Sequence, residues 1–265
     1  KDYLAVKTVL KNHGEKQIAH VYLNNSYTND QIAVMQQTDS SSIIVKNFLS
    51  IDNVKLLRSM IDTVEYPESG KTSKYAGSSY EHPPYGPTIQ NLLHNRLQSH
   101  IGNYKLDFFA WQEAIKPWKI HADIRWHAND IPHKVILIPL DVISDKQEWE
   151  DTYSITFKQR NYMRNNPNTN EGNAGNNDQT KWKRPIEHPN TEGCIDGYSI
   201  DKDVWKQYMT HVPYEHMEGL EIDKIYKWEP GSAVIWDANQ LHCADNFSAR
   251  NINTKLSILV MTNQA

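Results

Sequence analysis

Cysteine, long apolar runs and concentrated positive charge are all scarce in this 265-residue sequence. Two cysteines, Cys194 and Cys243, cannot form the disulfide framework of a small secreted domain, which favours a reducing, cytoplasmic location. No segment approaches the roughly 18 apolar residues of a membrane-spanning helix, so we expect no membrane partner. Basic residues are scattered and the formal net charge is -4, which argues against a nucleic-acid partner.

The amino-terminal run lacks the pattern of a secretory signal. Because the chain begins at Lys1 rather than Met, earlier removal of a leader stays an open alternative. Eight Trp and fourteen Tyr supply large buriable surfaces for a core. With no internal repeat in sight, we expect a single domain over 1–265.

Residues 1–103 predict a mixed, partly helical region. After the short apolar stretch at 42–50, Ser50 or Asp52 can cap a helix. The apolar stripe of that helix comprises Val54, Leu57, Met60, Ile61 and Val64. The Gly, Ser and Pro content of 70–86 predicts a loop. Pro87 can then open a second helix, whose buried side would comprise Ile89, Leu92, Leu93 and Ile101.

From residue 104 to 262 the pattern is one of short strands separated by turns, and not of long helices. The predicted strands are 105–113, 117–126, 133–141, 153–158, 223–228, 231–237 and 255–262. This favours an antiparallel sandwich or barrel with flanking helices. A long insert at about 156–190 interrupts the strands, and its Asn- and Gly-rich centre predicts no regular structure.

The stretch "WKIHADIRW" at 118–126 alternates apolar and polar side chains with a period of two. On a strand, His121 and Asp123 would therefore share one face. A histidine followed two residues later by an acid is a weak signal, since His13/Glu15 and His216/Glu218 repeat it in stretches without alternation. Alone, the pair could equally be part of a polar surface strand.

The carboxy-terminal stretch strengthens a metal-site interpretation. His242 follows a predicted strand, and on the last predicted strand Lys255 and Ser257 share a face. The ordered set of His121, Asp123, His242, Lys255 and Ser257 resembles the motif of the Fe(II)- and 2-oxoglutarate-dependent oxygenases. That resemblance covers roughly 104–262 and implies a double-stranded β-helix core, also called a jelly roll or cupin-like fold.

The resemblance also implies the chemistry. His121, Asp123 and His242 would bind Fe(II) as two imidazoles and one carboxylate. The co-substrate 2-oxoglutarate would chelate the metal, while Lys255 and Ser257 bind its distal carboxylate. Lys255 departs from the commoner Arg and stands thirteen residues after His242. Arg250, eight residues after His242, is therefore a rival anchor.

Asp123 favours hydroxylation or a related oxidation, because halogenases of this family carry a small residue at that position. Over 156–185 the insert carries six cations (Lys158, Arg160, Arg164, Lys181, Lys183 and Arg184) against two acids, Glu171 and Asp178. A basic lid of this kind suits an anionic substrate, although a solvated surface loop has the same composition. Candidate substrate-binding residues are Arg125, Arg160, Arg164 and Lys183.

The sequence therefore predicts an iron enzyme that oxidises a small, anionic molecule, such as an amino acid or a natural-product intermediate, and releases succinate and CO₂. Hydroxylation is the first expectation, with desaturation and oxidative cyclisation as alternatives. A protein or peptide hydroxylase is a second candidate, and a non-catalytic, metal-binding jelly-roll protein is a third. The sequence does not specify an oligomeric state.

Overall fold

The structure, a computed structural model, describes residues 41–63, 77–81, 86–123, 130–159 and 197–265. Its elements in chain order are β1 (Ile43–Val45), α4 (Ile51–Thr63), β2 (Gly77–Glu81), α5 (Gly86–Ile101), β3 (Tyr104–Ala114), β4 (Pro132–Ile143), β5 (Tyr153–Gln159), α6 (Lys202–Tyr208), η3 (Tyr214–Met217), β6 (Leu220–Lys227), β7 (Ala233–Asp237), β8 (His242–Ala244), η4 (Phe247–Arg250) and β9 (Thr254–Gln264). Within these ranges, no helix combines the length and apolarity needed to cross a bilayer.

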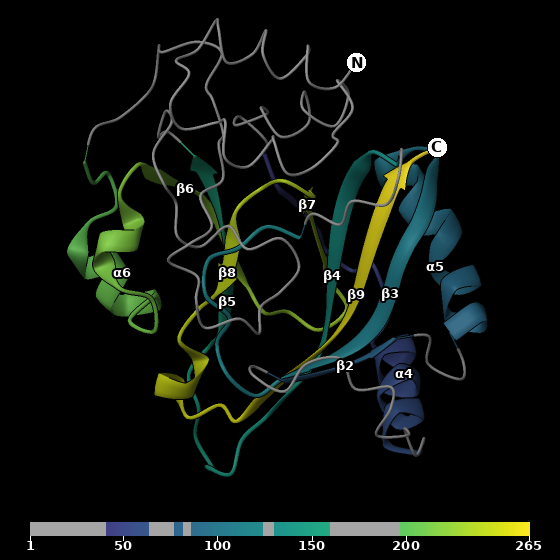
Figure 1. The fold of residues 1–265 in the computed structure, drawn as a ribbon. Helices are drawn as coiled ribbons and strands as arrows, with labels where there is room; N and C mark the ends of the chain where they lie inside the picture. The colour runs from purple at the N-terminus through teal and green to yellow at the C-terminus, as the bar shows by residue number, and fades with distance from the viewer. Residues whose placement is uncertain (1–40, 64–76, 82–85, 124–129, 160–196) are drawn as a thin grey trace, which may run out of the picture.

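Two antiparallel sheets form the body of the protein (Figure 1). The larger sheet has the strand order β1-β7-β4-β9-β3-β2, and the smaller has the order β6-β5-β8. An isolated bridge between His121 and His242 adds one further segment beside β8. Both sheets contribute to one apolar interior, which includes Tyr226, Trp236 and Leu259. The prediction of a mainly β fold with flanking helices and a jelly-roll core is confirmed.

Strand β9 shows how the larger sheet separates an outer core from the interior. Leu256, Ile258 and Val260 pack into the cluster that includes residues of α4 and α5. These two helices lie along the outer side of the larger sheet (Figure 1). Because side chains alternate along a strand, Lys255 and Ser257 must lie on the opposite face. They share this inward face with Leu259.

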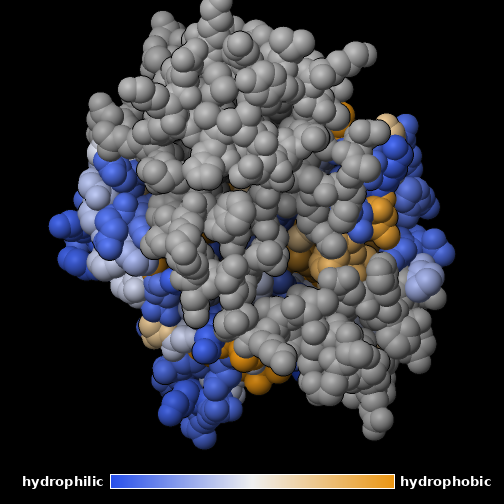
Figure 2. Space-filling view, in the orientation of Figure 1, coloured by the Kyte–Doolittle hydropathy of each residue, from blue (hydrophilic) through white to orange (hydrophobic). Residues whose placement is uncertain are grey.

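The smaller sheet is covered on its outer side by the segment around α6. Ile155 and Phe157 of β5 pack there in a cluster with Ile120 and with the segment Ile200–Met217. Figure 2 shows that the surface over α6 is largely hydrophilic. Ser154 and Thr156 alternate with these buried residues, so they point towards the other sheet.

Gly231 fixes the start of β7 against the loop that precedes α4. Its φ angle is 81°, in the left-handed region that favours glycine. Its carbonyl accepts a hydrogen bond from the Leu49 amide at 2.8 Å, and its amide donates to the Pro139 carbonyl at 3.0 Å. A Cβ at this position would lie 2.7 Å from the Leu49 carbonyl oxygen. The turn therefore requires glycine for both conformation and space.

The amino-terminal predictions are confirmed in part. Ser50 caps α4, since its hydroxyl accepts a hydrogen bond from the Asn53 amide at 3.2 Å. The prediction that Leu92 of α5 is buried is wrong, because Leu92 is 39% exposed. The predicted loop at 70–86 is also partly wrong, because Gly77–Glu81 forms β2 against β3. A Gly- and Ser-rich segment can adopt strand geometry at the edge of a sheet when the neighbouring strand, here β3, supplies its hydrogen bonds.

The prediction of a strand at 117–126 is wrong for residues 117–123, the part that the structure describes, because these residues do not form a regular strand. Ile120 and Ala122 are buried as the alternation predicted, but only His121 pairs, by exchanging both backbone hydrogen bonds with His242 at 3.0 and 2.9 Å. The backbone carbonyls of the two residues before Ile120 bond to side chains and not to a neighbouring strand. His121 Nδ1 bonds to Lys119 O at 2.7 Å, and His211 Nε2 contacts Trp118 O at 3.1 Å.

Candidate metal centre

Three side chains converge where the isolated bridge joins β8. One potential ligand atom from each of His121, Asp123 and His242 lies within 4.8 Å of the other two. The Asp123 carboxylate faces both rings, with Oδ1 3.5 Å from His121 Nε2 and Oδ2 3.1 Å from His242 Nε2. In the part of the chain that the structure describes, no second group of three His, Cys, Asp or Glu side chains converges in this way.

Backbone carbonyls orient both imidazoles in the same manner. His121 Nδ1 lies 2.7 Å from the Lys119 carbonyl oxygen, and His242 Nδ1 lies 3.1 Å from the Gln240 carbonyl oxygen. A carbonyl can only accept, so each Nδ1 carries the hydrogen. In the neutral ring, Nε2 is then left with its lone pair facing Asp123. A second nitrogen tied to a carbonyl is the usual arrangement for a metal-binding histidine.

The charges in the triad favour an ionised carboxylate. Burial acts to raise the pKa of Asp123, but His242 and His121 outweigh it and hold that pKa well below its usual range. Burial acts to lower the pKa of His121, but the Asp123 carboxylate outweighs it and raises that pKa. An ionised carboxylate that faces two imidazole nitrogens is a set of donors in which a divalent cation can take the place of a proton.

Aromatic rings flank both histidines. The Trp236 ring lies 4.5 Å from the His242 ring, centroid to centroid, and the Trp118 ring lies 5.4 Å from the His121 ring. Trp236 is 3% exposed and belongs to the interior cluster. These rings exclude water from one side of the triad, which strengthens its electrostatic interactions.

A hydrogen-bonded network around Asp223 holds Gln240, whose backbone carbonyl orients His242. The sequence did not predict this network. The Gln240 side chain donates to Asp223 Oδ2 at 3.1 Å, while the Gln240 carbonyl accepts from His242. The Ser42 and Thr156 hydroxyls also donate to Asp223 Oδ2, at 2.6 and 3.2 Å. No local pattern identifies this network, because its members come from four separate segments.

Lys255 and Ser257 face the interior together. Lys255 is 2% exposed, its Nζ donates to the Tyr153 carbonyl at 2.9 Å and it lies 3.9 Å from the centroid of the Trp228 ring. The Ser257 hydroxyl lies 3.5 Å from Gln112 Oε1. Burial lowers the pKa of Lys255 to about 8, against the opposing effect of the Asp245 carboxylate.

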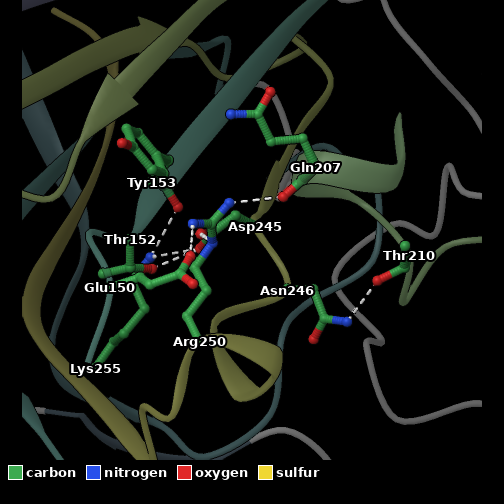
Figure 3. Close-up of polar contacts among 9 residues, drawn as sticks. All are labelled: Glu150, Thr152, Tyr153, Gln207, Thr210, Asp245, Asn246, Arg250 and Lys255. Atoms are coloured by element: carbon green, nitrogen blue, oxygen red, sulfur yellow. Dashed lines mark hydrogen bonds and ion pairs between the residues drawn. The ribbon is translucent and has the colours of Figure 1, made fainter. Parts of the chain in front are cut away.

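Arg250, the rival anchor, is engaged by the protein itself (Figure 3). Its guanidinium pairs with Glu150 at 3.0 Å and Asp245 at 2.9 Å, and it donates to the Gln207 carbonyl at 2.6 Å. Its Cζ also lies 5.3 and 5.4 Å from the centroids of two tyrosine rings, those of Tyr153 and Tyr208. These contacts join the segment after β8 to β5 and α6.

The four cations proposed for substrate binding lie outside the described residues, so their role stays a prediction: Arg125, Arg160, Arg164 and Lys183.

Fold and site together define a jelly-roll protein with a site of two histidines and one carboxylate. No protein-family model and no curated protein sequence matches the chain. It is similar to the non-heme alpha-ketoglutarate-dependent carbocyclase SnoK from nogalamycin biosynthesis, with 10% identity over 90% of this chain and 85% of that one, and a TM-score of 0.45.

Two further solved structures match over similar lengths. HygX from Streptomyces hygroscopicus, with nickel, 2-oxoglutarate and hygromycin B bound, is 8% identical over 90% of this chain and 88% of that one, with a TM-score of 0.46. EctD from S. alaskensis with bound Fe is 12% identical over 90% and 79%, with a TM-score of 0.47. Sequence identities and TM-scores this low do not indicate a shared activity. Inferences about activity therefore rest on the side chains of this chain.

Proposed function

We propose that this protein is an Fe(II)- and 2-oxoglutarate-dependent oxygenase. One observation carries the proposal: His121, Asp123 and His242 converge with both Nε2 atoms facing the carboxylate and both Nδ1 atoms bonded to backbone carbonyls. Two imidazoles and one carboxylate with open positions are the ligand set of non-heme Fe(II) oxygenases. Zinc sites built for structure instead use four protein ligands.

The residues present fit Fe(II). His121 and His242 would supply neutral nitrogen ligands, and the ionised Asp123 would cancel one of the two metal charges. When bound, the metal would let O₂ oxidise 2-oxoglutarate to succinate and CO₂ and oxidise the prime substrate in the same cycle. Trp118 and Trp236 would keep water away from the histidines, which limits side reactions.

Lys255 would bind the distal carboxylate of 2-oxoglutarate. It is a buried cation on the inward face of β9, and a buried ammonium forms strong hydrogen bonds with a carboxylate. Ser257 stands two residues further along on the same face and can donate a second hydrogen bond. Arg250 is a weaker candidate, because Asp245, Glu150 and a carbonyl already engage its guanidinium.

The proposed prime substrate is a small molecule with an acidic group, and the proposed reaction is hydroxylation. The acidic group is supported by the excess of cations in the insert, and hydroxylation by the carboxylate at position 123. Desaturation and oxidative cyclisation would use the same residues. A panel of small carboxylates and phosphates, screened for increased succinate release, would identify the substrate class.

The experiment that tests the enzyme class is turnover of 2-oxoglutarate by the purified full chain. With Fe(II), a reductant and air, we expect succinate to form slowly even without a prime substrate, and to stop when a chelator is added. Binding of Fe(II) and 2-oxoglutarate without any succinate, also across the substrate panel, would instead identify a non-catalytic binding protein.

A further inference from the structure

Three buried charges, Asp245, Arg250 and Lys255, meet where the chain passes from β8 through η4 into β9 (Figure 3). Asp245 is 0% exposed and Lys255 is 2% exposed, while the Arg250 side chain is 11% exposed. Charges buried this deeply are expensive unless they are paired. We call this group the buried charge cluster; the metal triad does not include any of its members.

Asp245 is held in place independently of Lys255. The Thr152 hydroxyl donates to Asp245 Oδ1 at 2.5 Å, and Arg250 Nε forms an ion pair with Asp245 Oδ2 at 2.9 Å. The Asp245 backbone amide also donates to the Tyr153 carbonyl at 3.2 Å. Each carboxylate oxygen therefore has its own partner, and the side chain cannot swing freely towards the ammonium.

Asp245 acts on Lys255 through charge more than through a hydrogen bond. The distance from Lys255 Nζ to Asp245 Oδ1 is 3.7 Å, beyond normal hydrogen-bond length. The ammonium donates one hydrogen to the Tyr153 carbonyl at 2.9 Å. Because an ammonium has three donors, Asp245 can stabilise its charge and still leave donors for a ligand.

Two further titratable groups near Lys255, His211 and Cys243, are neutral near pH 7. Burial lowers the pKa of His211, on the segment after α6, to about 4. Burial raises the pKa of the Cys243 thiol on β8 well above its usual range. Burial acts first to lower the pKa of Lys255, Asp245 acts most strongly to raise it, and Arg250 acts to lower it. Glu150 pairs with Arg250 from a side chain that is 73% exposed.

We propose that Asp245 is a built-in counter-ion that keeps Lys255 positively charged inside the barrel. Without a negative neighbour, an ammonium beside the Trp228 ring in a closed interior would release its proton and could no longer attract a carboxylate. The inference rests on the proposed function only for the identity of that carboxylate, the distal carboxylate of 2-oxoglutarate.

The two neighbours of Lys255 predict opposite results. Asp245→Asn removes the charge that stabilises the ammonium, so Lys255 should lose its proton at lower pH. Arg250→Gln removes a competing positive charge, so Lys255 should lose its proton at higher pH. General loss of stability cannot move the same titration in both directions. Glu150→Gln is the matched control, since it makes the same carboxylate-to-amide change on the exposed side of Arg250 and should leave the titration unchanged.

The first measurement uses calorimetric binding of 2-oxoglutarate to protein loaded with Ni(II) or Zn(II), from pH 6 to 9.5. Binding needs charged Lys255, so affinity should be constant below its pKa and fall about tenfold for each pH unit above it. For the wild type the fall should begin near pH 8. In Asp245→Asn the fall should begin at lower pH, and a midpoint lower by about one unit would give about fivefold weaker binding at pH 8. In Arg250→Gln it should begin above pH 8.

The second measurement follows the Lys255 side chain by NMR of lysine-labelled protein without co-substrate, using Lys255→Met to assign its signal. A lower midpoint in Asp245→Asn and a higher one in Arg250→Gln would support the counter-ion. Midpoints within a few tenths of a unit of the wild type would overturn it. If Asp245→Asn does not fold, Arg250→Gln decides by the same criterion. Shifted midpoints without any 2-oxoglutarate binding would instead refute the proposed function and leave the counter-ion standing.

Discussion

Replacing Lys255 by methionine tests how the interior recognises its co-substrate. The change keeps most of the side-chain volume and removes the charge of a residue that is 2% exposed. Truncating one partner of a buried charge pair typically costs about 3–5 kcal/mol, and little solvent screening reduces that figure at this depth. The corresponding loss of 2-oxoglutarate affinity is on the order of hundreds-fold or more, at about 1.4 kcal/mol per factor of ten.

The fold should tolerate this substitution. In Lys255→Met, Asp245 keeps its ion pair with Arg250 at 2.9 Å and its hydrogen bond from Thr152 at 2.5 Å. The free energy of unfolding should therefore fall by less than the about 3–5 kcal/mol typical of an unpaired buried charge. Thermal unfolding of the variant provides this check.

The assay is the 2-oxoglutarate concentration dependence of succinate release at pH 7, where Lys255 is charged. Lys255→Met should raise the 2-oxoglutarate Michaelis constant by hundreds-fold while leaving Fe(II) binding unchanged. Ser257→Ala, which removes one neutral hydrogen-bond donor, should raise it by no more than about tenfold. Arg250→Met should change it little at this pH. A larger effect in Arg250→Met than in Lys255→Met would give the anchor role to Arg250 and refute the reasoning.

Three further outcomes follow from the packing. Gly231→Ala should lower the free energy of unfolding in urea by about 2 kcal/mol or more, through left-handed strain plus the 2.7 Å contact with a carbonyl oxygen; Gly102→Ala, with φ 74° and open space, should show only the strain, and equal losses would contradict the contact. Because burial raises the pKa of Cys243, its thiol in a Cys194→Ser background should not react with a disulfide reagent at pH 8 until the protein is unfolded; fast reaction of the native protein would contradict this burial. Asp223→Asn should weaken metal binding by about tenfold or more through loss of its support for the histidine at the metal site, and an unchanged metal dissociation constant would make that network purely structural.

The period of two along a strand was a reliable predictor of side-chain direction on β9, which has a neighbouring strand on each side. On β9, between β4 and β3 in the larger sheet, the sequence predicted both the strand and the shared face of Lys255 and Ser257. The same alternation at 118–123 predicted the faces correctly, but not a regular strand. Its backbone finds a ladder partner only at His121, and no local pattern can reveal which carbonyls side chains will occupy.

The long-range polar groups lay beyond sequence reasoning for a related reason. The sequence did not identify Asp245 as a site residue, because a single aspartate three residues after a histidine belongs to no periodic pattern. Its importance arises from Thr152, Arg250 and Lys255, which reach it from separate segments. Segment β2 was missed because its Gly- and Ser-rich composition predicts a loop, whereas pairing with β3 decides its conformation.

The most direct test of the metal centre is the iron content and succinate production of single-alanine variants at positions 121, 123 and 242. Wild-type protein should bind one Fe(II) per chain and release succinate in an iron-dependent manner. His121→Ala, Asp123→Ala and His242→Ala should each lose succinate production while keeping the wild-type circular dichroism spectrum, because the metal needs all three ligands. His216→Ala, another histidine followed two residues later by an acid, should behave like the wild type. Near-normal turnover in any one of the three variants would contradict that ligand, and a wild-type protein that binds no iron would contradict the account as a whole.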